Sequence, residues 1–136
     1  MTVQCRVGPN AFAVREALLA ILGGPPVSDL PPDRRGVAEL VLAEVLNNVA
    51  EHGYGGGAGD ITVTLSRSCA GVSCLVVDQG RAMPDGCLPP GVLPGTDGVA
   101  LADLPEGGFG WHLIRSLTTK LCYTREAEQN RLSFLI

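Results

Sequence analysis

A long helix expected from Asp33 to about His52 limits the folds that this chain can adopt. Its apolar residues recur at helical spacing, at Val37, Leu40, Val41, Val45 and Val49. Asp33 can cap the first turn, and the glycine-rich stretch that begins at Gly53 ends the helix. Because only one side of such a helix is apolar, the chain must provide an apolar surface on which that side packs.

Alternating and apolar segments predict a sheet that supplies this surface. A helix capped by Asn10 is expected to run to about Leu22, and a short one from Phe109 to Leu117. Gly23 to Pro32 is a glycine- and proline-rich break, and Ser68 to Gly71 suits a hairpin link. The expected strands are Thr2–Val7, Ile61–Leu65, Val72–Val77, Leu121–Thr124 and Arg131–Ile136, with Glu126–Asn130 as the last turn.

This order of elements predicts an α+β two-layer sandwich, in which a mixed, mostly antiparallel sheet carries about three helices on one face. The 136 residues suit one domain spanning 1–136. Apolar residues make up 46% and charged residues 18% of the chain. That composition is typical of a globular protein that closes a hydrophobic core.

Charge and hydropathy argue against two classes of function. The net charge is −4 and no cluster of Lys and Arg occurs, so direct nucleic-acid binding is not expected. No apolar run reaches the roughly 18 residues of a membrane span, and Met1–Pro9 lacks the features of a signal peptide. We therefore expect a cytoplasmic protein without membrane contact.

The five cysteines include no CxxC pair, which argues against a disulfide framework or a zinc site. We expect them to be small apolar residues of a reduced protein. Cys87 falls in an expected loop.

Glu44, Asn48 and His52 form a polar row along the long helix, because a spacing of four residues keeps them on one face. A carboxylate and an amide oxygen one turn apart suit magnesium, and a carboxylate that the metal does not use can orient or deprotonate a hydroxyl nucleophile. A solvated helix face would show the same spacing, and His52 also suits the helix dipole. Zinc is disfavoured, since HExxH is absent.

Asp78, followed by Gln79 and Gly80, closes an apolar strand. Its carboxylate can accept a hydrogen bond from an exocyclic amino group such as that of adenine, and Gly80 lets a base approach the backbone. An ordinary strand end with a turn would give the same pattern.

Residues 79–108 are rich in glycine and proline and show no period, which is typical of a functional or mobile loop. Gly107, Gly108 and Gly110 stand at the expected start of the last helix. Glycines there free backbone N–H groups to face an anion, and the helix N-terminus adds a favourable dipole. The pattern is neither a Walker A motif nor a dinucleotide fingerprint.

Together and in this order, the three signals resemble the GHKL (Bergerat-fold) ATPases, and more closely the anti-sigma-factor serine kinases of partner-switching systems. Glu44-Val-Leu-Asn-Asn-Val-Ala-Glu-His-Gly-Tyr54 is similar to that family's N-box, and Asp78-Gln-Gly80 to its first glycine box. Gly107-Gly-Phe-Gly-Trp-His-Leu-Ile114 is similar to its second glycine box, and Asn130-Arg-Leu-Ser133 to its final strand. The resemblance covers essentially the whole chain and implies the histidine-kinase-like ATPase fold.

The resemblance also implies roles around the nucleotide base. Asp78 would hold the adenine amino group, Gly80 would shape that pocket, and Ser133 would assist it.

Around the phosphates, the resemblance implies that Glu44 is the general base for an attacking serine hydroxyl and that Asn48 ligates magnesium. Gly108 and Gly110 would present backbone to the phosphates of ATP. The segment from about 81 to 106 would be the ATP lid.

As a whole, the resemblance implies a protein-serine/threonine kinase that uses ATP and Mg²⁺. It would phosphorylate an antagonist protein and sequester a sigma factor or similar regulator of transcription. Relatives often dimerise, so a homodimer stays open.

The chain departs from the family pattern in both glycine boxes and in the lid, which contains Pro84, Pro89, Pro90, Pro94 and Pro105. Arg81-Ala-Met83 stands where many relatives have a second glycine in the first box, and His112 stands where the broader superfamily has a third glycine in the second box. These departures motivate an alternative, a nucleotide-gated protein-binding module without phosphotransfer. A third reading, a fragment of an ATP-hydrolysing machine, would need a transducer domain, and these residues contain none. Trp111 is expected to pack or to contact a partner rather than to stack on a base.

Overall fold

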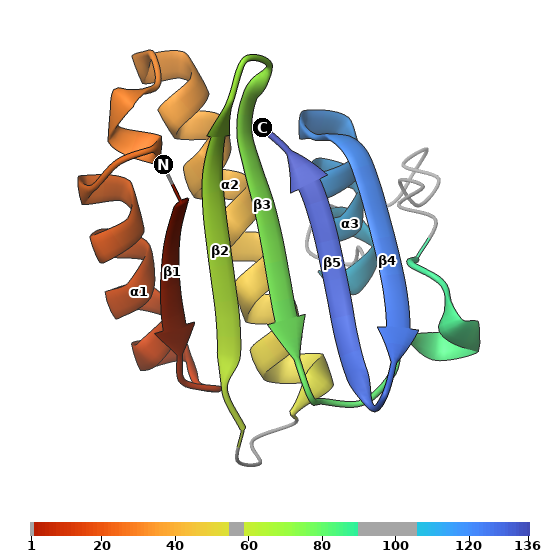
Figure 1. Cartoon of the computed structure of the whole chain (residues 1–136). Coiled ribbons are helices and arrows are strands. Elements are labelled where there is room, and N and C mark those ends of the chain that lie inside the picture. The colour runs from red at the N-terminus through yellow and green to blue at the C-terminus, as the bar shows by residue number, and fades with distance from the viewer. Residues whose placement is uncertain (1, 55–58, 90–105) are drawn as a thin grey trace.

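The computed structural model of the chain describes residues 2–54, 59–89 and 106–136, with the backbone alone at 106–109. Three α-helices of this part of the chain lie on one face of a five-stranded sheet (Figure 1). The predicted α+β two-layer sandwich is therefore confirmed. The elements are β1 (Thr2–Val7), α1 (Ala11–Gly23), α2 (Pro32–Asn48), β2 (Ile61–Ser68), β3 (Gly71–Asp78), α3 (Glu106–Leu117), β4 (Thr119–Glu126) and β5 (Gln129–Leu135).

The strand order is β1-β2-β3-β5-β4, and every neighbouring pair is antiparallel. The mostly antiparallel sheet that we expected is thus antiparallel throughout the described strands. β3 and β5 are neighbours although α3 and β4 separate them in the chain. This crossover brings the end of β3 beside the start of β5.

The core lies between the sheet and the helices. Alternate residues of the two central hairpin strands are buried, at Ile61, Val63, Leu65, Val72, Cys74 and Val76. Helix α2 packs on them through Val41, Leu42, Val45 and Leu46, each at most 1% exposed. Burying these side chains is the main source of stability, at about 1.5–3 kcal/mol for each large aliphatic residue. No helix among the described residues is long and apolar enough to cross a membrane.

The two long helices begin differently. Asn10 caps α1 as predicted, because its Oδ1 accepts the N–H of Ala13 at 2.9 Å. The prediction that Asp33 caps α2 is wrong: α2 begins at Pro32, its N-cap is Pro31, and no side chain caps it. Proline suits the first helical position because its missing N–H has no helical partner there in any case.

The long helix does not stay α-helical to His52. It is α-helical to Asn48 and continues as a π-helical turn over Val49–Gly53. A π-turn inserts an extra residue into the helical repeat, and such turns are frequent at functional sites.

Two further boundaries differ from expectation. Helix α3 begins at Glu106 instead of Phe109, so its glycines lie inside its first turns. The last hairpin turns at Ala127 and Glu128, which both have positive φ values of 51° and 63°. The expected turn Glu126–Asn130 was too long, because a two-residue turn without Gly or Asn carries no sequence signal. Asn130 therefore belongs to β5.

All five cysteines are free. Cys74 is a small buried residue of the core. Cys69, Cys87 and Cys122 are exposed.

Candidate functional site

A cavity of about 430 Å³ lies at the end of the sheet where β3 finishes, bordered by the end of α2 and by α3. This size is within the range of small-molecule sites, roughly 300–1,000 Å³. Asn48, Asp78 and Asn130 contribute polar groups to its wall. The rest of the wall comes from Val45, Val49, His52, Gly53, Arg81, Ala82, Met83, Pro84, Pro89, Trp111, Tyr123 and Leu132. A mostly apolar wall with a few polar groups suits a flat, partly polar ligand.

Asp78 is the buried carboxylate of this wall. It ends β3 and is only 4% exposed. Its Oδ1 accepts the N–H of Gly80 at 2.8 Å and the side-chain amide of Asn130 at 2.9 Å. Its Oδ2 has no hydrogen-bond partner within the described residues. One carboxylate oxygen is thus satisfied by the protein, and the other can accept a donor from a ligand.

Gly80 is required by close packing against the π-turn. A Cβ at residue 80 would lie 2.6 Å from the carbonyl oxygen of Gly53 and 2.9 Å from its Cα. The N–H of Arg81 donates to the same Gly53 oxygen at 2.9 Å. The sequence predicted that Gly80 lets a nucleotide base approach the backbone. In the structure, the group that leaves no room for a side chain at residue 80 is the backbone of Gly53. The close packing at Gly80 joins the π-helical turn that follows α2 to the segment that follows β3.

Glu44 and Asn48 face the first turns of α3. A Cβ at Gly110 would lie 2.5 Å from Oε2 of Glu44 and 3.8 Å from Nδ2 of Asn48. Nδ2 of Asn48 is buried and has no hydrogen-bond partner within the described part of the chain. Buried amide groups in proteins are nearly always paired. An unpaired one on a cavity wall indicates a place for a ligand.

The donors at this place fit magnesium. An Asn side chain can turn about its last bond and present Oδ1 in place of Nδ2, and the Glu44 carboxylate lies beside the same glycine. The described residues contain no group of three or more His, Cys, Asp or Glu side chains that could hold a metal ion. Magnesium is commonly held by one or two protein ligands together with substrate phosphates and water, so this sparse set is compatible with it.

Gly108 lies in the backbone of the first turn of α3. The first four N–H groups of a helix have no partner within the helix, and the dipole there favours an anion. The expected arrangement, with glycines preceding the helix, is corrected to glycines within its start. The start of α3 still faces the Glu44–Asn48 row through Gly110.

Ser133 lies on the wrong face of the sheet for the role that we expected. Its neighbours Leu132 and Phe134 are buried toward the helices, and side chains alternate between faces along a strand. Ser133 is paired with Leu75 and Cys122 and is not part of the cavity wall. The expectation that it assists a base is therefore corrected.

The position near Asp78 is filled by Asn130, which sequence reasoning placed in a turn. Its side-chain amide donates to Oδ1 of Asp78, to the Arg81 carbonyl at 2.9 Å and to the Gly80 carbonyl at 3.3 Å. Its Oδ1 accepts the Tyr123 hydroxyl and a guanidinium N–H of Arg125. The sequence missed Asn130 because the last turn was predicted too long. With the two-residue turn, Asn130 falls within β5, and its place in the strand determines which face its side chain occupies.

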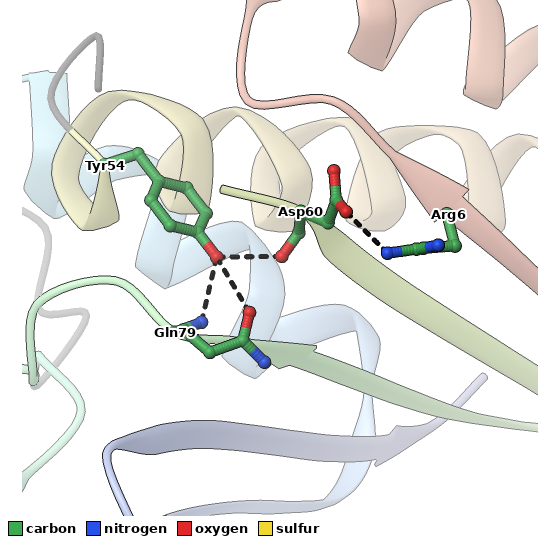
Figure 2. A network of polar contacts seen from close by, with 4 residues as sticks. All are labelled: Arg6, Tyr54, Asp60 and Gln79. Atoms are coloured by element: carbon green, nitrogen blue, oxygen red, sulfur yellow. Dashed lines mark hydrogen bonds and ion pairs between the residues drawn. The ribbon is translucent and has the colours of Figure 1, made fainter. Parts of the chain in front are cut away.

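Tyr54 fastens the outer side of the site, as Figure 2 shows. Its hydroxyl donates to the carbonyl of Asp60 at 2.8 Å and accepts the N–H of Gln79 at 2.8 Å. Arg6 holds the Asp60 carboxylate at 2.7 Å. A Cβ at Gly59 would lie 2.1 Å from the Tyr54 ring, so only glycine fits there. Tyr54 thus ties the segment after the π-turn to the residue that follows Asp78.

His52 and Trp111 also line the cavity. The His52 side chain is 66% exposed, so it stands at the rim of the cavity. Trp111 is 4% exposed and belongs to the core, in agreement with its expected packing role.

Part of the expected lid, 81–106, lies outside the described residues, namely 90–105. In the described part, Pro84–Gly86 form a 3-10 turn. Arg115 of α3 donates to the Pro89 carbonyl at 2.9 Å. This bond ties the last described residue before the gap to the helix that borders the cavity.

Comparison with known proteins gives one family match. The model of the histidine kinase-like ATPase domain matches residues 10–136. A comparison with curated proteins finds no match. The matched range contains all the predicted site residues from Glu44 to Ser133. Because the match spans nearly the whole chain and the fold agrees with it, the chain belongs to the family of histidine kinase-like ATPase domains.

Proposed function

We propose that this chain is a magnesium- and ATP-dependent protein-serine/threonine kinase of the anti-sigma-factor type. One observation carries the proposal: a buried carboxylate with a free oxygen, Asp78, and an unpaired buried amide, Asn48, line one cavity of nucleotide size. The polar row of α2 and the start of α3 meet beside that amide. Family membership supports nucleotide binding in general.

In this proposal the adenine lies in the cavity, and its exocyclic amino group donates to Oδ2 of Asp78. Met83, Trp111 and Leu132 offer apolar surface to the ring. The phosphates extend toward the N-terminus of α3, whose unpaired N–H groups suit an anion.

Asn48 would hold the magnesium ion, which would neutralise charge on the phosphate oxygens. Glu44 would accept the proton of a serine hydroxyl on the protein substrate. The serine oxygen would then form a bond to the γ-phosphorus, the bond from that phosphorus to the β–γ bridging oxygen would break, and ADP would leave. Positioning and charge neutralisation account for most of the rate in such transfers.

The partners follow from the resemblance alone. The phosphate acceptor would be a small antagonist protein, and the sequestered partner a sigma factor or an equivalent regulator. In this scheme the nucleotide state decides which partner is bound, and a homodimer is compatible with the proposal.

Calorimetric titration of ATP, with and without Mg²⁺, tests the site. We expect Asp78→Asn to weaken binding at least tenfold, because losing a hydrogen bond to a charged group costs about 1.5–3 kcal/mol. Asn48→Ala should remove the part of the affinity that depends on Mg²⁺ and leave the rest. Failure of the wild type to bind ATP under either condition would contradict nucleotide binding altogether.

A second candidate is a nucleotide-gated binding module without phosphotransfer. It is favoured by Arg81-Ala-Met83 and His112, which stand where relatives have glycines. Incubating the protein and labelled ATP with a partner-switching antagonist protein separates the two functions. Phosphoserine or phosphothreonine in the antagonist, lost in Glu44→Gln, supports the kinase. Tight ATP binding with no transfer supports the binding module.

A further inference from the structure

Asn130 occupies a central place in a row of residues that crosses the sheet beside the cavity. Asp78 is paired directly with Asn130 on one side, and Arg125 with Asn130 on the other. Residues paired directly across neighbouring strands point to the same face of a sheet. Asn130 therefore stands between the carboxylate that lines the cavity and the guanidinium group at the edge strand.

The side chain of Asn130 is fully used. It is 6% exposed, and its amide hydrogens face Oδ1 of Asp78 and the carbonyls of Arg81 and Gly80. Its oxygen accepts from Tyr123 and Arg125. An Asn side chain has two N–H donors and one acceptor oxygen, so no part of this amide is left for a ligand.

Arg125 decides which way the amide of Asn130 points. Its guanidinium group lies 3.1 Å from the Asn130 oxygen and carries donors only. The atom of Asn130 that faces Arg125 must therefore be oxygen, and the NH₂ group must face Asp78. Oδ1 of Asp78 is in consequence engaged by a donor from Asn130.

The same cluster holds the backbone that follows Asp78. Arg125 donates to the Gly80 carbonyl at 2.7 Å, and Asn130 to the Arg81 carbonyl at 2.9 Å. The N–H of Met83 donates to the Tyr123 hydroxyl at 3.0 Å. Residues 81–83 form part of the cavity wall. The side chains of the β4–β5 hairpin therefore set both the carboxylate and the wall beside it.

We propose that Asn130 is a specificity-determining positioning residue, which engages Oδ1 of Asp78, leaves Oδ2 to meet the base, and so selects a purine that presents an amino group over one that presents a carbonyl. This inference rests on the proposed nucleotide site. Because Oδ1 is engaged by two donors, Oδ2 is the oxygen that meets the base. A 6-oxo purine would bring a carbonyl oxygen against Oδ2, and neither group could donate.

The test compares the affinities for ATP and ITP, each with Mg²⁺, in the wild type and variants. ITP carries a carbonyl where ATP carries the amino group. We expect the wild type to prefer ATP by about tenfold to a hundredfold, the effect of one hydrogen bond to a charged group. Asn130→Ala should weaken ATP binding at least fivefold and ITP binding much less. The dissociation constant for ITP divided by that for ATP should therefore become smaller.

Two further variants complete the experiment. Tyr123→Phe removes only the hydroxyl that Asn130 and Met83 share. It should also reduce the preference for ATP over ITP, and it allows the test to be made if Asn130→Ala does not fold. Ser133→Ala is the matched control, because Ser133 lies on the same strand but faces away from the cavity. Its ratio should equal that of the wild type.

The outcomes separate this inference from the function beneath it. A smaller ratio in folded Asn130→Ala or Tyr123→Phe supports the positioning role. Equal weakening of ATP and ITP, or an unchanged ratio, overturns it while leaving the nucleotide site intact. A wild type that binds neither nucleotide overturns the site and the inference together.

Discussion

At the scale of single residues, Gly80 and Gly110 differ in what an added side chain would contact. A Cβ at Gly80 would collide with the Gly53 backbone, whereas a Cβ at Gly110 would collide with the end of the Glu44 side chain and lie at an ordinary contact distance, 3.8 Å, from Nδ2 of Asn48. Backbone cannot yield without moving an element, but a carboxylate on a flexible stem can. Substitution at Gly110 should therefore affect chemistry more than folding.

We predict that Gly110→Ala folds with a stability within about 1 kcal/mol of the wild type, since alanine favours a helix over glycine by a similar amount. Displacement of the Glu44 carboxylate should abolish the Mg²⁺-dependent part of ATP binding. Urea unfolding and calorimetry measure the two effects separately.

Gly36→Ala is the matched control for that variant. Gly36 lies exposed within α2, and a Cβ there would have nothing within 4 Å. This change should stabilise the protein by about 0.5–1 kcal/mol and leave ATP binding alone. Unaltered Mg²⁺-dependent binding in Gly110→Ala would show that the space beside Glu44 is not used by the ligand.

At the scale of elements, the link between the π-turn and β3 depends on Tyr54. Its hydroxyl joins the segment after the turn to Gln79. Burial raises the pKa of Tyr54 above its ordinary value of 10.0; the hydrogen bond from Gln79 opposes this rise, and the carboxylates of Asp78 and Asp60 add to it. The folded state therefore keeps this proton at pH values where the unfolded chain loses it.

The sign of the pH effect follows from that difference. Below about pH 10 both states hold the proton and the stability is unaffected, whereas above it the unfolded state alone ionises and the free energy of unfolding falls. We predict that Tyr54→Phe lowers the free energy of unfolding by about 1 kcal/mol at pH 7, because its hydrogen bonds are lost. Between pH 10 and 11 the free energy of unfolding of the variant should fall less steeply than that of the wild type. Urea midpoints over this range measure both effects, and parallel curves for the two proteins would contradict the assigned shift.

At the scale of the whole molecule, the cysteines report on how the fold opens. Cys74 is 1% exposed in the core, and burial raises the pKa of its thiol to about 12. Cys69, Cys87 and Cys122 are exposed, and Cys5 is half-buried with a pKa that burial also raises. Only thiolates that a reagent can reach are modified quickly.

We predict that a thiol reagent at pH 8 modifies Cys69, Cys87 and Cys122 quickly, Cys5 more slowly, and Cys74 only through global unfolding. Peptide mapping by mass spectrometry follows each site, and denatured protein, in which all five should react, is the control. Rapid modification of Cys74 in the native protein would mean that the sheet and α2 separate without global unfolding.

Much of this arrangement could be predicted from local sequence. The apolar stripe of α2 and the alternation in β1, β2 and β3 indicated which faces are buried. The structure confirms this for the strands and for Val41, Val45 and Val49, whereas Leu40, which the predicted stripe included, is 52% exposed. Asp78 at a strand end and Glu44 and Asn48 one helical turn apart were identified for the same reason, since spacing within one element determines which side chains share a face. Their roles remain predictions.

What local sequence could not show depends on contacts between elements distant in the chain. The need for glycine at 80 comes from the Gly53 backbone, and the place of Asn130 beside Asp78 comes from the crossover that pairs β3 with β5. A two-residue turn at Ala127 and Glu128 moved Asn130 into a strand, and strand parity placed Ser133 on the far face. Spacing along the chain thus determined the motifs, whereas strand order and register, which depend on long-range packing, decided which side chains meet around the cavity.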